Sequence, residues 1–558
     1  MKKAWLGVLC VVFLVGLLAA CSNDNSGSNV NSNAGVNNNG TETTGNEEQP
    51  SEGASDGILR TGQGPADKFS AAWADYGGLF KTQVFRRLLM LDEQLQPVHY
   101  DLATAYTMSD DEKTYTFTLR DDVKWHDGEP FTPEDVKWSL AMAVQSAQIN
   151  AVFSGAFGKI VGADALKAGE ADELSGVTID GNTLTIELTE PVGVFLLTMA
   201  QWPPYPKHLL ESEDPATLHL ASFWEKPIGN GPYMLTEVVP NNYAMLELYP
   251  DYYGTAPKVE KIMLQTISED QLVTKAQAGE LDYMPVMDLN QATEIVKSPD
   301  YEANPVDLLY VRFLMPNLVG QNATTDGNDK IADLRIRQAL LHAIDRESLA
   351  GMLYPDQAEV LQTLVPTALP EYNEEAVVYD YNPEKAKQLL EEAGFDFNQT
   401  IRLQYYYTDQ QTVDLIDTIK FFWEEIGVKV EASLMQGNLL ELIYTKRDYD
   451  FLYAGLSAMA FEEAYGFFHS DGIGVQVVGA SPDKWDPLVD ELRRTSDPDD
   501  RMDVINRLQA MEAEFLTRMP LFSMKQYVIV NKSNLETAGI YGNEWTNYDR
   551  KLEEWSMK

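Results

Sequence analysis

The chain has 558 residues, 44% of them apolar, and its formal charge of −44 comes from 86 acidic against 42 basic residues. This excess repels nucleic acid and anionic lipid, so neither is an expected partner. The length predicts roughly three domains. The two cysteines, Cys10 and Cys21, both lie near the N-terminus, which excludes a disulfide scaffold, thiol catalysis and a cysteine metal site in the rest of the chain.

The first twenty residues have the layout of a secretory signal peptide. Lys2 and Lys3 precede an uncharged apolar run over 4–20, and small residues stand just before Cys21. A transmembrane helix is the rival interpretation, since the run only reaches the lower end of the roughly 17–25 residues that cross a bilayer. The ending Leu-Ala-Ala-Cys resembles the lipobox of bacterial lipoproteins. It implies cleavage after residue 20, lipidation of Cys21, and anchoring to the outer face of the bacterial cytoplasmic membrane through lipid only.

Residues 21–57 are predicted to form a disordered tether behind the lipidated cysteine. The segment is rich in Asn, Ser and Gly and has no basic residue, so it cannot bury enough surface to offset its ordering entropy. Its root-mean-square span is on the order of 30 Å. Residues 53–57 match the G-x-S-x-G nucleophile elbow, but their low-complexity flanks make this a chance match.

The early part of the body carries hairpin signals. Residues 114–120 alternate between polar and apolar, and Asp180-Gly181-Asn182 separates two further alternating runs over 177–188. Another hairpin is expected over 233–249. Thr132, followed by proline and two acidic residues, is typical of a helix N-terminus. These signals predict a β-rich subdomain over about 90–225.

The later part alternates strands with helices. Helices are predicted over 384–393, 415–426 and 437–447, and strands over 401–408, 428–434 and 449–456. This order indicates parallel strands with right-handed crossovers, hence an α/β unit. Ligands of open parallel sheets bind beyond the carboxyl ends of the strands, here near Tyr407–Thr408 and Leu456–Ser457.

Motifs for metal, cofactor or nucleophilic chemistry are missing from the sequence. The six histidines show no metal-ligand spacing, and no Walker loop or G-x-G-x-x-G follows a strand. Ser481 to Lys484 fits S-x-x-K but reads as a turn. With 86 acidic residues, carboxylate pairs for glycoside hydrolysis arise by chance and cannot be tested. No metal, no cofactor and no enzymatic activity are therefore predicted.

Several stretches, taken in order, carry a resemblance to a known family. They are 115–136 (Y-T-F-T-L-R-D-D-V-K-W-H-D-G-E-P-F-T-P-E-D-V), 229–233 (G-N-G-P-Y), 249–262, 278–282, 334–346 and 381–394. Together they resemble the extracellular solute-binding proteins of the dipeptide and oligopeptide class (family 5), from about Leu79 to about Phe522. Most of these motifs are expected to have structural roles as turns.

The resemblance implies an α/β, two-lobed periplasmic-binding-protein-like fold with mixed sheets, a hinge and an interlobe cleft. Lobe I would comprise 58–305 plus 525–558, and lobe II, inserted in it, 306–524. Such proteins trap a solute by hinge closure and deliver it to the permease subunits of an ABC importer. A peptide or peptide-like solute and a monomeric receptor are the expectation.

The sequence departs from the family's peptide binders after the last strand. There the family has Gly-Trp and, four residues after the Gly, an Asp that holds the peptide's amino terminus. Here Leu456 follows Gly455 and Met459 takes the Asp position. A buried ammonium needs a carboxylate partner. Either Glu462 or Glu463 supplies it, or the ligand is not held by a free amino terminus.

The candidate ligand-binding residues come from both lobes. From lobe II they are Tyr407, Leu456, Ser457, Met459, Phe461 and Glu462, and from lobe I Trp73, Tyr76, Trp202 and Tyr233. Met suits a permissive pocket, but it fills core gaps as readily, and both interpretations of Met459 stay open.

Other functions remain as alternatives. The same fold would serve a binder of a sugar, a metal chelate or another small molecule, or a binding protein that feeds a sensor. A tethered secreted hydrolase is the distant alternative. Turnover that one carboxylate mutation abolishes would indicate the hydrolase, whereas ligand-induced closure without turnover would indicate a binding protein.

Overall fold

The computed structural model describes residues 56–62, 79–92, 96–97, 99–146, 151–286, 288–320, 328–458, 460–479, 481–540 and 551–558. The predicted signal peptide, Cys21 and nearly all of the tether lie outside this part of the chain, as do Trp73, Tyr76 and Met459. Within it, no helix combines the length and the apolar character needed to span a bilayer.

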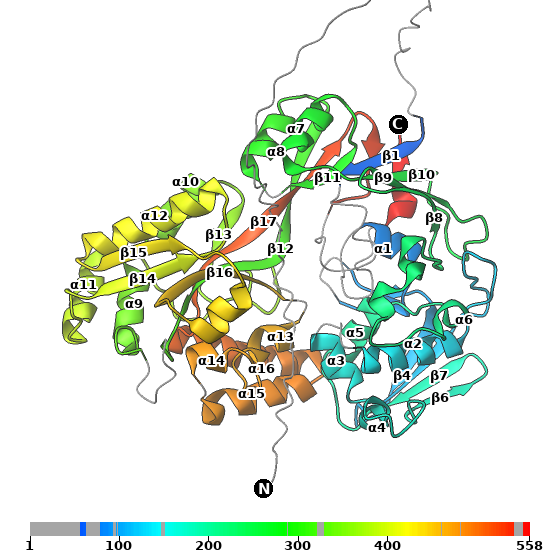
Figure 1. Ribbon diagram of the computed structural model, residues 1–558, viewed down its shortest axis with the longest axis horizontal. Helices are drawn as coiled ribbons and strands as arrows, with labels where there is room; N and C mark the ends of the chain where they lie inside the picture. Colours follow the sequence, from blue (N-terminus) through cyan, green and yellow to red (C-terminus); the bar gives the residue numbers. More distant parts are fainter. Residues whose placement is uncertain are drawn as a thin grey trace, which may run out of the picture.

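One eleven-stranded mixed sheet runs through the whole molecule (Figure 1). In sheet order its strands are β15 (Lys429–Leu434), β14 (Thr400–Tyr405), β16 (Phe451–Ser457), β12 (Tyr301–Pro316), β17 (Met519–Asn531), β11 (Tyr283–Val286), β1 (Ile58–Gly62), β10 (Lys261–Gln265), β9 (Tyr243–Leu248) and β8 (Tyr233–Val239), with β13 (Ala358–Val360) pairing β17. The long strands β12 and β17 pair antiparallel and are shared by the two lobes. The predicted two-lobed α/β fold with mixed sheets is confirmed.

Lobe I surrounds the β8–β9–β10–β1–β11 half of the sheet and carries a second sheet. That sheet is β4 (Ala103–Met108), β5 (Thr114–Leu119), β7 (Thr183–Glu187) and β6 (Val177–Asp180). The lobe's helices are α1 (Leu79–Val84), α2 (Pro133–Gln145), α3 (Ala151–Phe157), α4 (Ala163–Lys167), α5 (Phe195–Gln201), α6 (Lys207–Leu210), α7 (Glu269–Gln277) and α8 (Leu289–Ile295), with 3₁₀ turns η2 (Leu218–Leu220), η3 (Ser222–Glu225) and η5 (Leu552–Glu554). Two short strand pairings complete it: β2 (Leu89–Met90) with β3 (His99–Tyr100), and β18 (Leu535–Glu536) with β19 (Ser556–Met557).

Lobe II has two cores, one on each face of its part of the sheet. One core packs under α9 (Leu334–His342), α10 (Arg346–Leu353), α11 (Pro383–Glu392) and α12 (Gln410–Glu425). The other packs under η4 (Glu441–Lys446), α13 (Phe461–Gly466), α14 (Val475–Val478), α15 (Pro482–Arg494) and α16 (Pro498–Phe515). Both of these cores are separate from the large core that is built mainly from lobe I residues.

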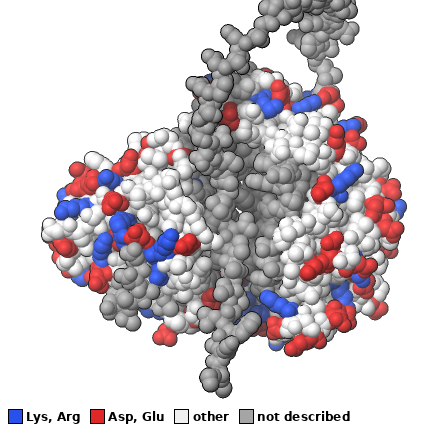
Figure 2. Space-filling model, viewed as in Figure 1, with Lys and Arg blue, Asp and Glu red and all other residues white. Residues whose placement is uncertain are grey.

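Charged side chains are spread over the outer surface of both lobes rather than gathered on one patch of the face shown in Figure 2. A dispersed excess of acidic groups keeps an exported protein soluble and does not by itself mark a binding surface.

The predicted hairpins and caps of lobe I are confirmed. β5 buries Tyr115, Phe117 and Leu119 on one face, as the alternation predicted. β6 and β7 form the hairpin around Gly181, and β8 and β9 form the next one. At the start of α2 the backbone N–H of Thr132 donates to the Asp135 carboxylate at 2.8 Å, which satisfies a donor that the helix itself leaves unpaired.

The strand–helix alternation of lobe II is confirmed, with one correction. β14 pairs parallel with both β15 and β16, as the crossover rule required. The helix predicted over 437–447 was wrong in its bounds: a short π-helix covers only Glu441–Lys446. Gly437 has a φ of 117°, far from helical geometry, and the Asn438 carboxamide accepts the N–H of Glu441, so the helix begins later.

The motif around His126 fastens the turn that begins at Gly229. The N–H of His126 donates to the Gly229 carbonyl at 2.8 Å, and its Nδ1 accepts the Gly229 N–H at 3.2 Å. Nε2 lies 3.0 Å from the Gly231 carbonyl and must donate to it. The turn itself packs on the backbone of Gln83 and Val84 at the C-terminal end of α1, too closely for any Cβ on Gly229 or Gly231. The segment around His126 and the Gly-Asn-Gly-Pro-Tyr turn over 229–233 therefore hold each other in place by hydrogen bonds.

We expect Gly229→Ala to destabilise lobe I by about 2–3 kcal/mol, because its methyl group would overlap the Val84 carbonyl and force the backbone apart. The matched control is Gly351→Ala in α10, where no atom lies within 4 Å of the added Cβ, and a gain of about 0.5–1 kcal/mol is expected. Urea unfolding followed by circular dichroism measures both. Equal behaviour of the two variants would contradict the assigned packing.

The stability of lobe I should fall with acid through His126. Burial lowers the pKa of this imidazole to about 4, below the ordinary value near 6.5. Between these values the unfolded chain binds the proton more readily, so the contribution is complete above pH 6.5 and is lost as the pH falls towards 4. Its size is at most about 3 kcal/mol. We expect His126→Gln to flatten the pH dependence of unfolding in this window, whereas His99→Gln, at an exposed site, should keep the wild-type slope.

Candidate solute-binding site

The carboxyl ends of β14 and β16 meet β12 where that strand enters lobe II. Tyr405 pairs with Tyr453 between β14 and β16. Ser457 pairs with Tyr310, and Gly455 with Arg312, between β16 and β12. The structure therefore brings together the two strand ends that the sequence indicated, and adds a third strand that the sequence did not indicate.

Tyrosines crowd this junction around one arginine. The Arg312 guanidinium carbon lies 3.7 Å from the ring centre of Tyr407, 4.4 Å from that of Tyr310 and 5.6 Å from that of Tyr453. The Tyr310 hydroxyl donates to that of Tyr407 at 3.0 Å, and the hydroxyls of Tyr406 and Tyr407 are 3.2 Å apart. We call Tyr310, Arg312, Tyr406, Tyr407 and Tyr453 the tyrosine–arginine cluster.

Gly455 makes room for this cluster. A Cβ there would stand 2.7 Å from the Tyr407 hydroxyl, 2.8 Å from Nη1 of Arg312 and 2.9 Å from the Tyr310 hydroxyl. These separations are shorter than van der Waals contact, so a side chain at position 455 would overlap the polar atoms of three neighbouring side chains. The glycine that ends the Tyr-Ala-Gly strand motif thus has a physical reason to be glycine.

Three tyrosines of the cluster are held in the neutral form by burial. Burial raises the pKa of Tyr310, Tyr406 and Tyr453 well above the usual value near 10. Their rings attract the guanidinium through the π-face but carry no charge to balance it.

The end of β16 and the start of α13 carry the remaining predicted residues of lobe II. Leu456 and Phe461 are half-buried, each with one side against the second core of lobe II, and Ser457 is exposed. Glu462 forms a two-pronged ion pair with Arg501, at 2.6 and 3.2 Å. Glu462, one of the two carboxylates predicted as partner for an ammonium group, is thus already matched by a cation.

Two aromatic residues expected from lobe I lie in its core. Trp202 is 3% exposed and packs edge-on against Phe153 and Tyr205. Tyr233 is fully buried, and its hydroxyl donates to the Val259 carbonyl at 2.7 Å. In this structure neither presents its side chain to a cleft, since aromatic burial stabilises the lobe. Trp73, Tyr76 and Met459 fall outside the described residues.

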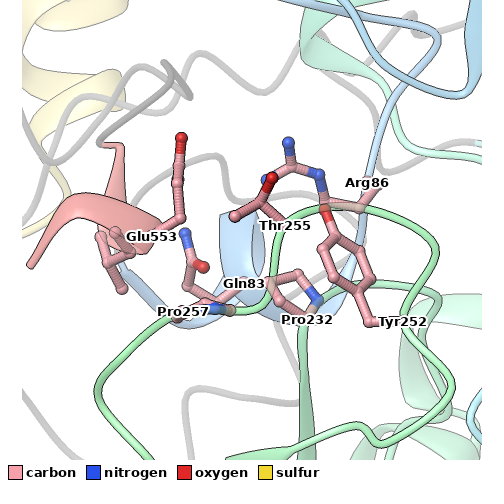
Figure 3. A pocket seen from close by; sticks show the side chains of 8 residues that line it. Gln83, Arg86, Pro232, Tyr252, Thr255, Pro257 and Glu553 are labelled. Carbon is pink, nitrogen blue, oxygen red and sulfur yellow. The ribbon is translucent and has the colours of Figure 1, made fainter.

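A separate cavity of about 160 Å³ lies in lobe I, away from the tyrosine–arginine cluster (Figure 3). Its lining is Gln83, Arg86, Pro232, Tyr252, Thr255, Pro257, Leu552 and Glu553. Arg86 is not a free anchor there, because it pairs with Asp101 at 2.6 Å. The cluster in lobe II is therefore the stronger candidate for recognition.

The two lobes also touch at the end opposite to their shared strands, where α13 approaches α3 (Figure 1). The Gly193 N–H donates to the Arg493 carbonyl at 2.8 Å, and Ser496 hydrogen-bonds Glu112. Gly193 packs directly on the Arg501 guanidinium and the Thr495 carbonyl. This interlobe contact joins residues about 300 positions apart in sequence, so the local patterns gave no sign of it.

The described residues contain no group of histidine, cysteine, aspartate and glutamate that could hold a metal ion. The model of the bacterial extracellular solute-binding proteins, family 5 (middle part), matches residues 97–473. The chain belongs to this family. Its members are solute-binding proteins, and the chain is accordingly a binding component of the ABC importer class rather than a member of an enzyme family.

Individual relatives agree in sequence or in fold. A putative ABC transporter peptide-binding protein of Brucella ovis is 28% identical over 404 residues, which cover 70% of this chain and 71% of that protein. The structure of a putative peptide-binding protein, AppA, from Clostridium difficile has a TM-score of 0.76 at 19% identity and covers 90% of this chain and all of that one. NikZ from Campylobacter jejuni, in complex with Ni(L-His), has a TM-score of 0.72 at 22% identity with the same coverage.

Gly193→Ala should hold the lobes of this solute-binding protein apart, because its methyl group would overlap the Arg501 guanidinium and the Thr495 carbonyl. The expected result is a larger radius of gyration in small-angle X-ray scattering, with an unchanged unfolding temperature of each lobe. Gly155→Ala in α3 adds a methyl group with no atom within 4 Å and serves as control. An unchanged radius in Gly193→Ala would contradict the contact.

Proposed function

We propose that the protein is a surface-tethered receptor that captures a peptide or peptide-like solute between its lobes by hinge closure and delivers it to an ABC importer. The signal peptide over 1–20, the lipid on Cys21, the tether and the monomeric state belong to this proposal. Tyr407, Leu456, Ser457 and Phe461 are its ligand contacts in lobe II.

The observation that carries the proposal is an interruption in the ladder between β12 and β17. Asp307 pairs with Lys525, and the next pair is Val311 with Ser523. Between these two pairs β12 therefore contains more residues than β17 does. A bulge weakens and bends a ladder at one place. The register shift on β12 lies between residues that pack in the core of lobe I and residues that pack in the cores of lobe II, and a hinge between the lobes is expected at such a place.

The location of the tyrosine–arginine cluster supports capture between the lobes. It lies at the carboxyl ends of β14 and β16, next to the interrupted ladder on β12. A solute bound there would contact lobe II first and lobe I only after closure. Closure then follows to the extent that the solute binds the closed form better.

Peptide-like ligands are favoured by the relatives' names, whereas the neighbour with bound Ni(L-His) favours a chelate as second candidate. A chelate would bring its own metal ligands, since the described residues provide no metal-binding group.

Solute capture is tested with the full chain purified from its native membrane. Mass spectrometry of extracted small molecules and metal analysis identify what co-purifies, and calorimetry with a defined library of di- to hexapeptides measures affinity. We expect peptides in the extract, tight binding of some library members, and a smaller radius of gyration when they bind. Nickel or another metal in the extract would assign the chelate instead.

Ser457→Trp tests the site itself, because an indole at this exposed strand end would fill the space beside Tyr310, its partner on β12. Affinity should fall at least tenfold and ligand-induced closure should disappear. Ser222→Trp, at an exposed position of lobe I, is the control and should behave as wild type. Product formation from any library peptide, or wild-type affinity in Ser457→Trp, would contradict the proposed function or its site.

A further inference from the structure

Arg312 is a cation that the surrounding fold leaves without a counter-charge. It stands in the middle of β12, between the buried Val311 and Phe313, on the strand face that carries the tyrosines. The residue is only partly exposed, and its Nη1 is inaccessible to solvent without a hydrogen-bond partner. Among the described residues the guanidinium makes no hydrogen bond and no ion pair, and its close contacts are aromatic rings.

The other buried arginines of lobe II are treated differently. Arg337 donates to the carbonyls of Ile331, Ala332 and Phe515, each at 2.8 Å. Arg346 donates to the Pro520 and Tyr379 carbonyls at 2.8 and 2.6 Å. Arg518 pairs with Glu512 at 2.8 Å. Arg447 donates to the Gln476 carbonyl. Each of these four guanidinium groups has at least one hydrogen-bond or ion-pair partner, and Arg312 differs from all four.

Among the residues that the structure describes, no neighbouring group supplies the missing negative charge. Burial raises the pKa of Tyr310, Tyr406 and Tyr453 well above the usual value, so these three rings carry no negative charge. Asp409 lies near Tyr310, but its carboxylate accepts the Thr412 N–H at 2.7 Å and the Thr412 hydroxyl at 2.8 Å, which caps α12. A buried cation without an ion-pair partner is expensive to maintain, so its presence requires a reason.

Hydrogen-bond donors converge at the same point. Two hydrogen bonds join the hydroxyls of Tyr310, Tyr406 and Tyr407, so one proton of the three is donated outside the trio. The guanidinium adds unused N–H groups beside it. A guanidinium flanked by hydroxyl donors is suited to the oxygens of a carboxylate or phosphate.

We propose that Arg312, with Tyr407, binds an anionic group of the solute, a carboxylate or a phosphate, so that the solute is held by its negative end. This inference rests on the proposed function and specifies its ligand class. It agrees with the two features that disfavour capture of an amino terminus: the family's aspartate position is Met459 in the sequence, and Glu462 is paired with Arg501.

The test compares the full-length protein with Arg312→Met, which keeps the length of the side chain and removes the charge. Arg335→Met on α9 is the control, because Arg335 is an exposed residue paired with Asp333. Calorimetry uses matched di- to hexapeptides with a free terminal carboxylate or a terminal amide, and inorganic phosphate. Unfolding temperatures of the ligand-free proteins are measured in parallel.

We expect wild type and Arg335→Met to bind the carboxylate forms, or phosphate, at least tenfold more tightly than the amides. Arg312→Met should lose this preference and, freed of an unpaired charge, unfold about 2–4 °C higher without ligand. Preference for phosphate with no distinction between the peptide forms would assign a phosphorylated solute.

Equal affinity of wild type for both peptide forms without phosphate binding would overturn the inference, as would a preference that survives in Arg312→Met. So would a wild type that binds no probe together with a lower unfolding temperature of Arg312→Met, because the cation would then be structural. Peptide binding and closure that persist unchanged in Arg312→Met would leave the proposed function intact. Absence of binding, closure and co-purified solute in every protein would count against the proposed function itself.

Discussion

The antiparallel pairing of β12 with β17 is the constraint on which the rest of the molecule depends. These strands carry the chain into lobe II and back, so their backbone hydrogen bonds serve both lobes at once. Each lobe packs its own core against its own part of the sheet. The register shift between Asp307 and Val311 interrupts this ladder at the place proposed for the hinge, and because β16 pairs with β12, the carboxyl end of β16 lies beside it.

The sequence predicted best those features that depend on near neighbours. The hairpin at Gly181, the N-cap at Asn382 and the parallel order of β14 with β15 follow from turn chemistry, capping and handedness rules that act over a few residues or one crossover. The end of β16 at Ser457 was placed correctly for the same reason, whereas β14 ends at Tyr405, before the predicted Tyr407–Thr408. Where local geometry overrode periodicity, as at Gly437, the predicted helix was too long.

The composition of the candidate site could not be predicted, because its members come from strands far apart in the chain. Arg312, Tyr407 and Gly455 meet only once the sheet has formed. The one signal available in the sequence was Arg312, a charged residue inside an apolar strand, because a charged residue that becomes buried is normally paired. Glu462 illustrates the reverse case: a carboxylate at a plausible position that a distant arginine on α16 neutralises after folding.

Hinge closure requires that the solute, and not the lobes themselves, decides between the open and the closed form. The interlobe contact consists of few hydrogen bonds, each worth about 1 kcal/mol. Such a contact positions the lobes without locking them. An unbalanced cation near the hinge complements it, because the charge disfavours burial in the empty closed form and favours it once an anion is present. If the solute carries the anionic group proposed above, this side chain gives it the higher affinity for the closed state on which ligand-driven closure depends.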